Sequence, residues 1–69
     1  MVPWARMGLA SALRGMDELA AAESMGASVI DDFPEYLAAY DSVASVREEM
    51  GKLAEAQEVL AEGQRKIAE

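Results

Sequence analysis

The chain has 69 residues, neither cysteine nor histidine, and a formal net charge of −7. Without these two residue types it lacks disulfides and the commonest nucleophiles, general bases and transition-metal ligands. Its acidic balance is also unfavourable for nucleic acid, because contact with phosphates needs a basic face. We therefore expect a protein that is not an enzyme, holds no cofactor or metal ion, and has no nucleic-acid partner.

The composition favours helix, since alanine supplies 14 of the 69 residues and loses no side-chain freedom in a helix. An all-α chain this short buries little surface and is marginal alone, which favours oligomerisation or docking on a larger partner. No apolar run approaches the roughly 20 residues of a membrane span, so we expect no transmembrane segment. We expect a soluble chain that is cytoplasmic or virion-associated rather than secreted.

Residues 3–25 are predicted to form a first, amphipathic helix. Pro3 suits a first helical turn, and apolar side chains follow it at intervals of three and four residues. The first half of this helix has no acid and carries Arg6 and Arg14. Segment 1–25 is therefore predicted to dock on a larger partner. The alternative for residues 1–16 is a mitochondrial targeting peptide, which an acid-poor amphipathic segment also fits.

Residues 26–32 are predicted to form a linker and a helix cap. Gly26 can end the first helix in a left-handed conformation. Asp32, Pro34 and Glu35 resemble a capping box with a proline in the first turn of the next helix. A hard-cation site is the alternative use of these acids, but the ligand spacing and central glycine of a calcium loop are missing.

Residues 33–69 are predicted to form one long helix with coiled-coil heptads. With Tyr36 at heptad position a, eight of the ten a and d positions up to Ile67 are apolar. The outward f positions are all acidic, the last being Glu69, which supports the same register. The predicted oligomer seam consists of Val43, Val46, Met50, Leu53, Gln57, Leu60, Gln64 and Ile67.

This seam predicts a homo-oligomer, and a trimer rather than a dimer. The flanking positions hold small residues such as Ala54 and Ala61, and the charged pairs that select partners in many dimers are missing. Gln57 and Gln64 would place amides in buried layers, where they need hydrogen-bond partners. The alternative is one amphipathic helix of a compact bundle.

These features predict a structural or assembly protein, a coiled-coil oligomerisation or adaptor element anchored by its N-terminal half to protein partners. Short anchored coils of this kind occur in phage tails and fibres, so a virion is one such assembly. The alternative is an acidic regulatory module, an inhibitor or chaperone, whose residues 17–41 bind a basic partner surface. The residues predicted to dock on a partner are Trp4, Met7, Leu9, Leu13, Met16, Phe33, Tyr36 and Tyr40.

Overall fold

The computed structural model describes residues 3–68, so Glu69 and residues 1–2 of the predicted docking segment lie outside the described part of the chain. Within it, all regular secondary structure is helical, which confirms the predicted all-α fold. The helices are α1 (Pro3–Gly15), α2 (Leu19–Asp32), α3 (Ala38–Glu49) and α4 (Leu53–Ala68).

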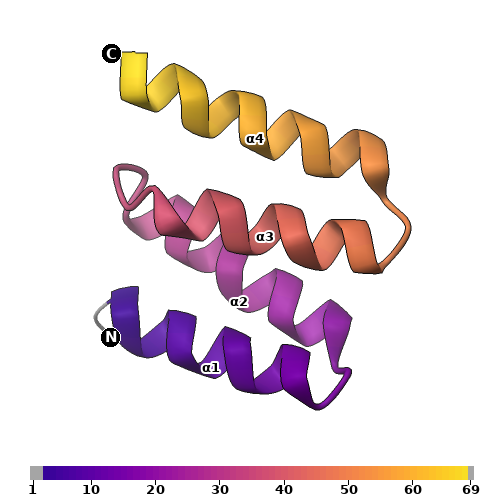
Figure 1. Cartoon of the computed structure of the whole chain (residues 1–69). Helices are drawn as coiled ribbons and strands as arrows, with labels where there is room; N and C mark the ends of the chain where they lie inside the picture. Colours follow the sequence, from indigo (N-terminus) through magenta and orange to yellow (C-terminus); the bar gives the residue numbers. More distant parts are fainter. Residues whose placement is uncertain (1–2, 69) are drawn as a thin grey trace.

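The helices form a flat stack in chain order (Figure 1). Successive helices run in opposite directions, α2 lies behind α1 and α3, and α4 packs on the other side of α3. The Cα atoms extend over 35 × 29 × 13 Å. The Cα atoms of a single helix span about 4.6 Å across its axis, so the shortest dimension has room for two helix layers, with α2 behind α1 and α3. The main helix contacts are those of α1 with α2, α2 with α3 and α3 with α4, so α1 and α4 are the two ends of the stack.

The predicted break at 26–32 lies elsewhere, because α2 continues through Gly26 to Asp32. Gly26 is buried in the middle of this helix, where its missing side chain lets α3 come close. Pro34 ends α2 instead of starting the next helix, since the residue before a proline disfavours helical geometry. The predicted capping box is also absent: α3 begins after Leu37, and no side-chain cap bond forms there.

The predicted single helix over 33–69 is likewise not found, because the chain reverses at Gly51 between α3 and α4. Gly51 has a φ of 80°, the left-handed conformation that closes a helix. Its N–H donates to Glu48 O at 3.0 Å, and the Lys52 N–H donates to Arg47 O at 2.8 Å. This pair of bonds is the Schellman motif, which satisfies the last carbonyls of α3.

The predicted single helix over residues 3–25 is not found either, because the chain turns between α1 and α2 with the same geometry. Asp17 has a φ of 62°, a conformation that aspartate tolerates better than most side chains. Its N–H donates to Arg14 O at 3.0 Å, and the Glu18 N–H donates to Leu13 O at 2.8 Å. Every residue of this motif lies 34 positions before its counterpart in the α3–α4 turn. The chain is thus two helix–turn–helix units of the same design.

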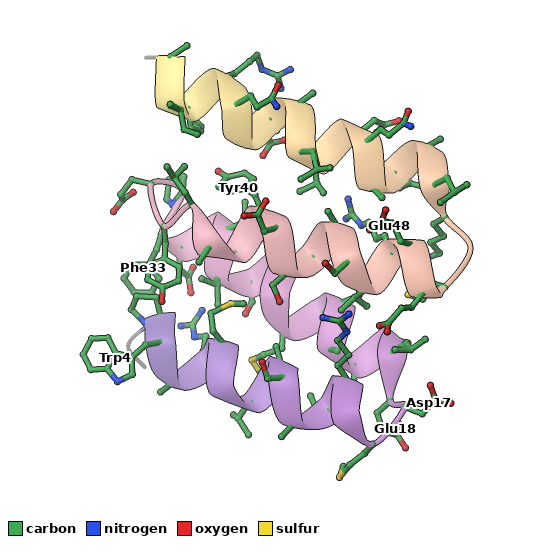
Figure 2. All side chains as sticks on the ribbon, viewed as in Figure 1. Trp4, Asp17, Glu18, Phe33, Tyr40 and Glu48 are labelled. Carbon is green, nitrogen blue, oxygen red and sulfur yellow. The ribbon has the colours of Figure 1, made fainter. Side chains whose placement is uncertain are left out.

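The core is built from small side chains together with one large one. Tyr40 is 2% exposed and lies between α3 and α4 (Figure 2). It packs against Gly63, where an added Cβ atom would lie 3.1 Å from Tyr40 Cγ. Its hydroxyl donates to Pro34 O at 2.7 Å, which ties the α2–α3 connection to the core. The buried hydrophobic residues are Ala10, Ala22, Val29, Ala39, Tyr40, Val43, Ala44, Val46, Ala56 and Val59.

Candidate functional site

Helix α4 exposes a row of side chains beside its contact with α3. This row, the α4 stripe, recurs at intervals of three and four residues, so it follows one side of the helix. Its three aliphatic members are exposed by 60% at Leu53, 37% at Leu60 and 68% at Ile67. Helix α4 therefore has a second apolar side besides the buried one. The α4 stripe consists of Leu53, Gln57, Leu60, Gln64 and Ile67.

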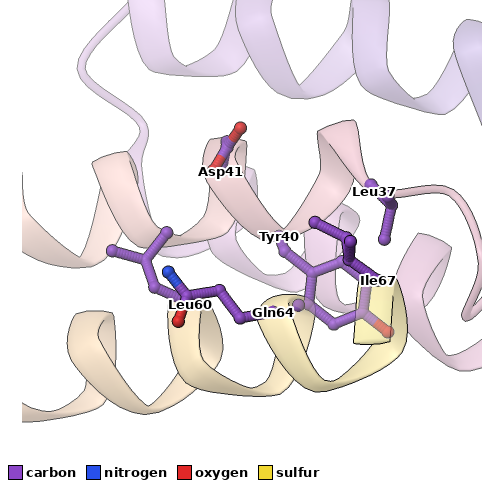
Figure 3. A pocket seen from close by; sticks show the side chains of 7 residues that line it. Leu37, Tyr40, Asp41, Leu60, Gln64 and Ile67 are labelled. Atoms are coloured by element: carbon purple, nitrogen blue, oxygen red, sulfur yellow. The ribbon is translucent and has the colours of Figure 1, made fainter. Parts of the chain in front are cut away.

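An open groove of about 210 Å³ lies between the start of α3 and the C-terminal half of α4 (Figure 3). Leu37 and Tyr40 line it from one side, and three members of the α4 stripe line it from the other. Small-molecule pockets have volumes of about 300–1,000 Å³. The groove is smaller and open, so it suits an apolar side chain of a protein partner. Its lining residues are Leu37, Tyr40, Asp41, Leu60, Gly63, Gln64 and Ile67.

The predicted seam residues do not share one helix face. Val43 and Val46 are buried in α3, and Met50 is half-buried at its end. The other five predicted seam residues form the exposed α4 stripe. The turn at Gly51 separates the two sets and folds α4 back onto α3, so the valines are used inside the chain.

The residues predicted to dock on a partner are divided between surface and core. Trp4 and Met16 are exposed, and Figure 2 shows Trp4 projecting from the start of α1. Leu9 is 45% exposed on the same helix. Met7, Leu13, Phe33 and Tyr36 are half-buried, and Tyr40 lies in the core.

Two apolar surfaces thus lie at opposite ends of the stack. We call Leu9, Leu13 and Met16 the α1 face; it is the surface at the start of the stack. The α4 stripe is the surface at the other end.

Ion pairs join different helices of the stack. Arg6 lies 2.6 Å from Asp32 and links α1 to the end of α2. Its guanidinium also stands over the ring of Phe33, 5.8 Å from the centroid. Arg14 Nε donates to Glu49 Oε2 at 2.7 Å, which links the C-terminal ends of α1 and α3. Most positive charge is therefore used within the chain.

Glu23 on α2 is the acceptor for two cations of the α3–α4 unit. Arg47 Nε lies 2.9 Å from one carboxylate oxygen, and Lys52 Nζ lies 3.5 Å from the other. The hydrogen bond from Arg47 holds the pKa of Glu23 below its ordinary value; partial burial opposes this, and the charge of Lys52 adds to it. The ionised carboxylate is thus the form that the folded state prefers.

Stability is expected to fall in acid partly through Glu23. Because its pKa is lower in the folded than in the unfolded chain, its contribution is complete above the unfolded value of about 4.3 and is lost as the pH falls through the folded value. Urea midpoints measured between about pH 6 and pH 3 should therefore decline less for Glu23→Gln than for the wild type. Glu58→Gln, at an exposed carboxylate of α4, should keep the wild-type decline. Equal declines for Glu23→Gln and the wild type would contradict this role.

A second groove of about 210 Å³ has an acidic lining. It lies where α2, α3 and α4 meet, and its charged residues are Asp31, Glu58, Glu62 and Arg47. Three carboxylates against one guanidinium make this the more acidic of the two grooves.

In the described range 3–68, no group of three or more acidic side chains has the geometry to hold a metal ion. No helix in that range is long and apolar enough to cross a membrane. Comparison of the chain with family models, with curated proteins and with solved structures finds no match.

The internal repeat and the groove residue Leu37 were not predicted from the sequence. A signal for the repeat exists, since several identical residues recur 34 positions apart, but helical periodicity within each half does not reveal it. A search for self-similarity at a fixed period would find this spacing. The recurring pairs include Ala10/Ala44, Met16/Met50, Leu19/Leu53, Ala22/Ala56 and Ala27/Ala61.

Proposed function

We propose that this chain is a protein-assembly module of the helical-repeat type, without catalytic activity, that binds a protein partner along the α4 stripe and the adjoining groove. The observation that carries the proposal is that a chain of two like helix hairpins has an apolar surface on α4. Stacked repeats of this kind form extended surfaces on which partners bind. Within residues 3–68, α4 exposes Leu53, Leu60 and Ile67.

The repeat length supports the same class of function. Helix–turn–helix units of 34 residues are those of tetratricopeptide arrays, and stacked units of this kind form extended surfaces for binding proteins. This similarity is one of architecture. The proposal retains the adaptor or assembly role predicted from the sequence. The binding surface, however, belongs to a stack of helices and not to a single coiled-coil helix. A place in a virion stays a prediction.

The experiment is site-specific photo-crosslinking in the cells that make the protein. A photoreactive residue at position 60 should give a discrete protein adduct, because Leu60 lies on both the α4 stripe and the groove wall. The same residue at position 54 should give none, since Ala54 is exposed about 120° around the helix from Leu60. Adding Ile67→Glu should abolish the adduct at position 60. Equal labelling from both positions would refute the proposed site.

The acidic groove favours a second candidate function, the binding of a basic partner surface. Glu58 and Glu62 line that groove on the other side of α4 from Leu60. Attraction between such charges weakens as salt is added. An adduct that forms from position 58, is absent from position 60 and disappears at high salt would favour this candidate over the first.

A further inference from the structure

The α4 stripe has a counterpart on α2, displaced by 34 residues. Gly26 of α2 corresponds to Leu60 of α4, and Glu23 corresponds to Gln57. The two helices occupy equivalent places in units of the same design, so equivalent positions point in equivalent directions relative to the helix before each of them. The full set of corresponding pairs is Leu19/Leu53, Glu23/Gln57, Gly26/Leu60, Ile30/Gln64 and Phe33/Ile67.

On α2, the three middle positions of this set, Glu23, Gly26 and Ile30, lie in the surface that receives α3. A Cβ atom on Gly26 would lie 2.5 Å from Val43 Cγ2, so the two helices approach closely there. Arg47 Nε lies 2.9 Å from Glu23 Oε2 in the same interface. Ile30 packs against the core cluster that includes Val43. The exposed α4 stripe is therefore the surface on which a third unit of this design would place its first helix.

The other end of the stack supplies a helix of the required kind. Within α1, Leu9 and Leu13 stand at the positions that Val43 and Arg47 occupy in α3. Val43 and Arg47 are two of the α3 residues that contact α2. Leu9 is 45% exposed. Each copy of the chain thus carries, at opposite ends, side chains at the positions equivalent to the two sides of its α2–α3 interface, although the residue types differ.

Charge does not oppose contact between these ends. The two arginines of α1 are paired within the chain, Arg6 with Asp32 and Arg14 with Glu49. The α4 stripe and the residues of the α1 face carry no formal charge, so no like charges are brought together at their centres.

We infer that a second copy of this chain docks head to tail, with its α1 face on the α4 stripe of the first copy. Helix α1 of the second copy then packs on α4 of the first as α3 packs on α2 within one chain. The inference rests on the proposed function and names the partner of that site. It pairs Leu9 of one copy with Leu60 of the other, and Leu13 with Gln57. Because Leu60 replaces Gly26, the incoming helix lies farther from α4 than α3 lies from α2.

Such an interface uses different surfaces on the two copies, so it does not close on itself in a dimer. Each added copy leaves one α1 face and one α4 stripe free, and this arrangement grows into open chains unless the rotation closes a ring. The expected behaviour is therefore association that rises continuously with concentration.

Sedimentation velocity over a concentration series tests the inference. The wild type should sediment faster as its concentration rises, and Leu9→Glu or Leu60→Glu should each weaken association by about tenfold or more. Ala54→Glu makes the same charge change at an exposed position of α4 outside the stripe and should leave association unchanged. Helical circular dichroism of each variant checks that it is folded. A wild type that stays monomeric up to about 1 mM would overturn the inference.

A mixing experiment distinguishes head-to-tail docking from a symmetric α4–α4 contact. Leu9→Glu keeps a working α4 stripe, and Leu60→Glu keeps a working α1 face. An equimolar mixture should therefore form a dimer that grows no further, although each variant alone stays monomeric. A symmetric contact predicts no such rescue, so failure to form this dimer would overturn the inference.

Disulfide trapping gives a direct readout, because the chain has no cysteine of its own. Oxidation of mixed Leu9→Cys and Leu60→Cys proteins should give the 9–60 disulfide in excess over the 9–9 and 60–60 products. An excess of 60–60 would overturn head-to-tail docking and leave the proposed function standing. If photo-crosslinks from position 60 join this chain only to other proteins, head-to-tail docking is again overturned and the proposed function stands. If neither crosslinks nor self-association are found, both the docking and the proposed function are overturned.

Discussion

Replacement of Gly26 with leucine is expected to destabilise the fold by about 3 kcal/mol or more, since overpacking of a close contact typically costs 1–3 kcal/mol and occasionally more. The Cβ atom alone would lie 2.5 Å from Val43 Cγ2. Val43 is 1% exposed and β-branched, so it has little freedom to move aside. The rest of the leucine side chain would then force α2 and α3 apart.

Gly8→Leu is the matched control for this substitution. Gly8 is an exposed residue inside α1, and a Cβ atom built there meets nothing within 4 Å. Leucine favours helix over glycine by somewhat less than about 1 kcal/mol, so this variant should be slightly stabilised. Urea unfolding followed by circular dichroism gives both free energies. If the two leucine variants shift the free energy of unfolding in the same direction, the close approach at Gly26 is not a feature of the folded protein.

The helical class of the fold could be predicted because it depends on composition and local periodicity. The helix boundaries depend on the conformation of single residues. Glycine can either end a helix or allow close packing inside one. Gly26 and Gly51 are both acceptable as helix terminators, but only Gly51 has positive φ. Gly26 is small because α3 crosses there, and that contact joins segments distant in the sequence.

The heptad pattern was misleading for a related physical reason. Val43 and Leu60 both belong to it, yet they lie on helices that fold back on each other. A helix that packs on two neighbours needs a wide apolar surface, and its spacing of three and four residues is the same as that of a coiled-coil seam. Periodicity identified which positions are apolar, whereas the 34-residue repeat decides which of them have a neighbour. For this reason the sequence indicated the residues of the α4 stripe but did not indicate that α4 packs on α3.

Tyr40→Ala is expected to destabilise the protein by about 3–5 kcal/mol, the range for removal of a buried aromatic side chain. The ring fills the space over Gly63, where a Cβ atom would lie 3.0 Å from Tyr40 Cβ, and it belongs to the cluster with Val43 and Val59. Alanine would leave a cavity in this cluster, and a cavity that its neighbours cannot fill adds to the loss of burial. Most small domains have only 5–15 kcal/mol of stability, so we expect this variant to be largely unfolded at moderate urea concentrations.

Tyr40→Phe separates ring packing from the hydroxyl. It keeps the ring and removes the hydrogen bond to Pro34 O, which is 2.7 Å long, so it should lower the free energy of unfolding by only about 0.5–1.5 kcal/mol. Leu37→Ala, at a groove position that is 39% exposed, should also cost less than Tyr40→Ala because less surface leaves contact. Equilibrium urea unfolding of the three variants gives the comparison. If Tyr40→Ala were no more destabilising than Leu37→Ala, Tyr40 would not be the residue that holds α4 to α3, and the groove beside it would have no fixed wall.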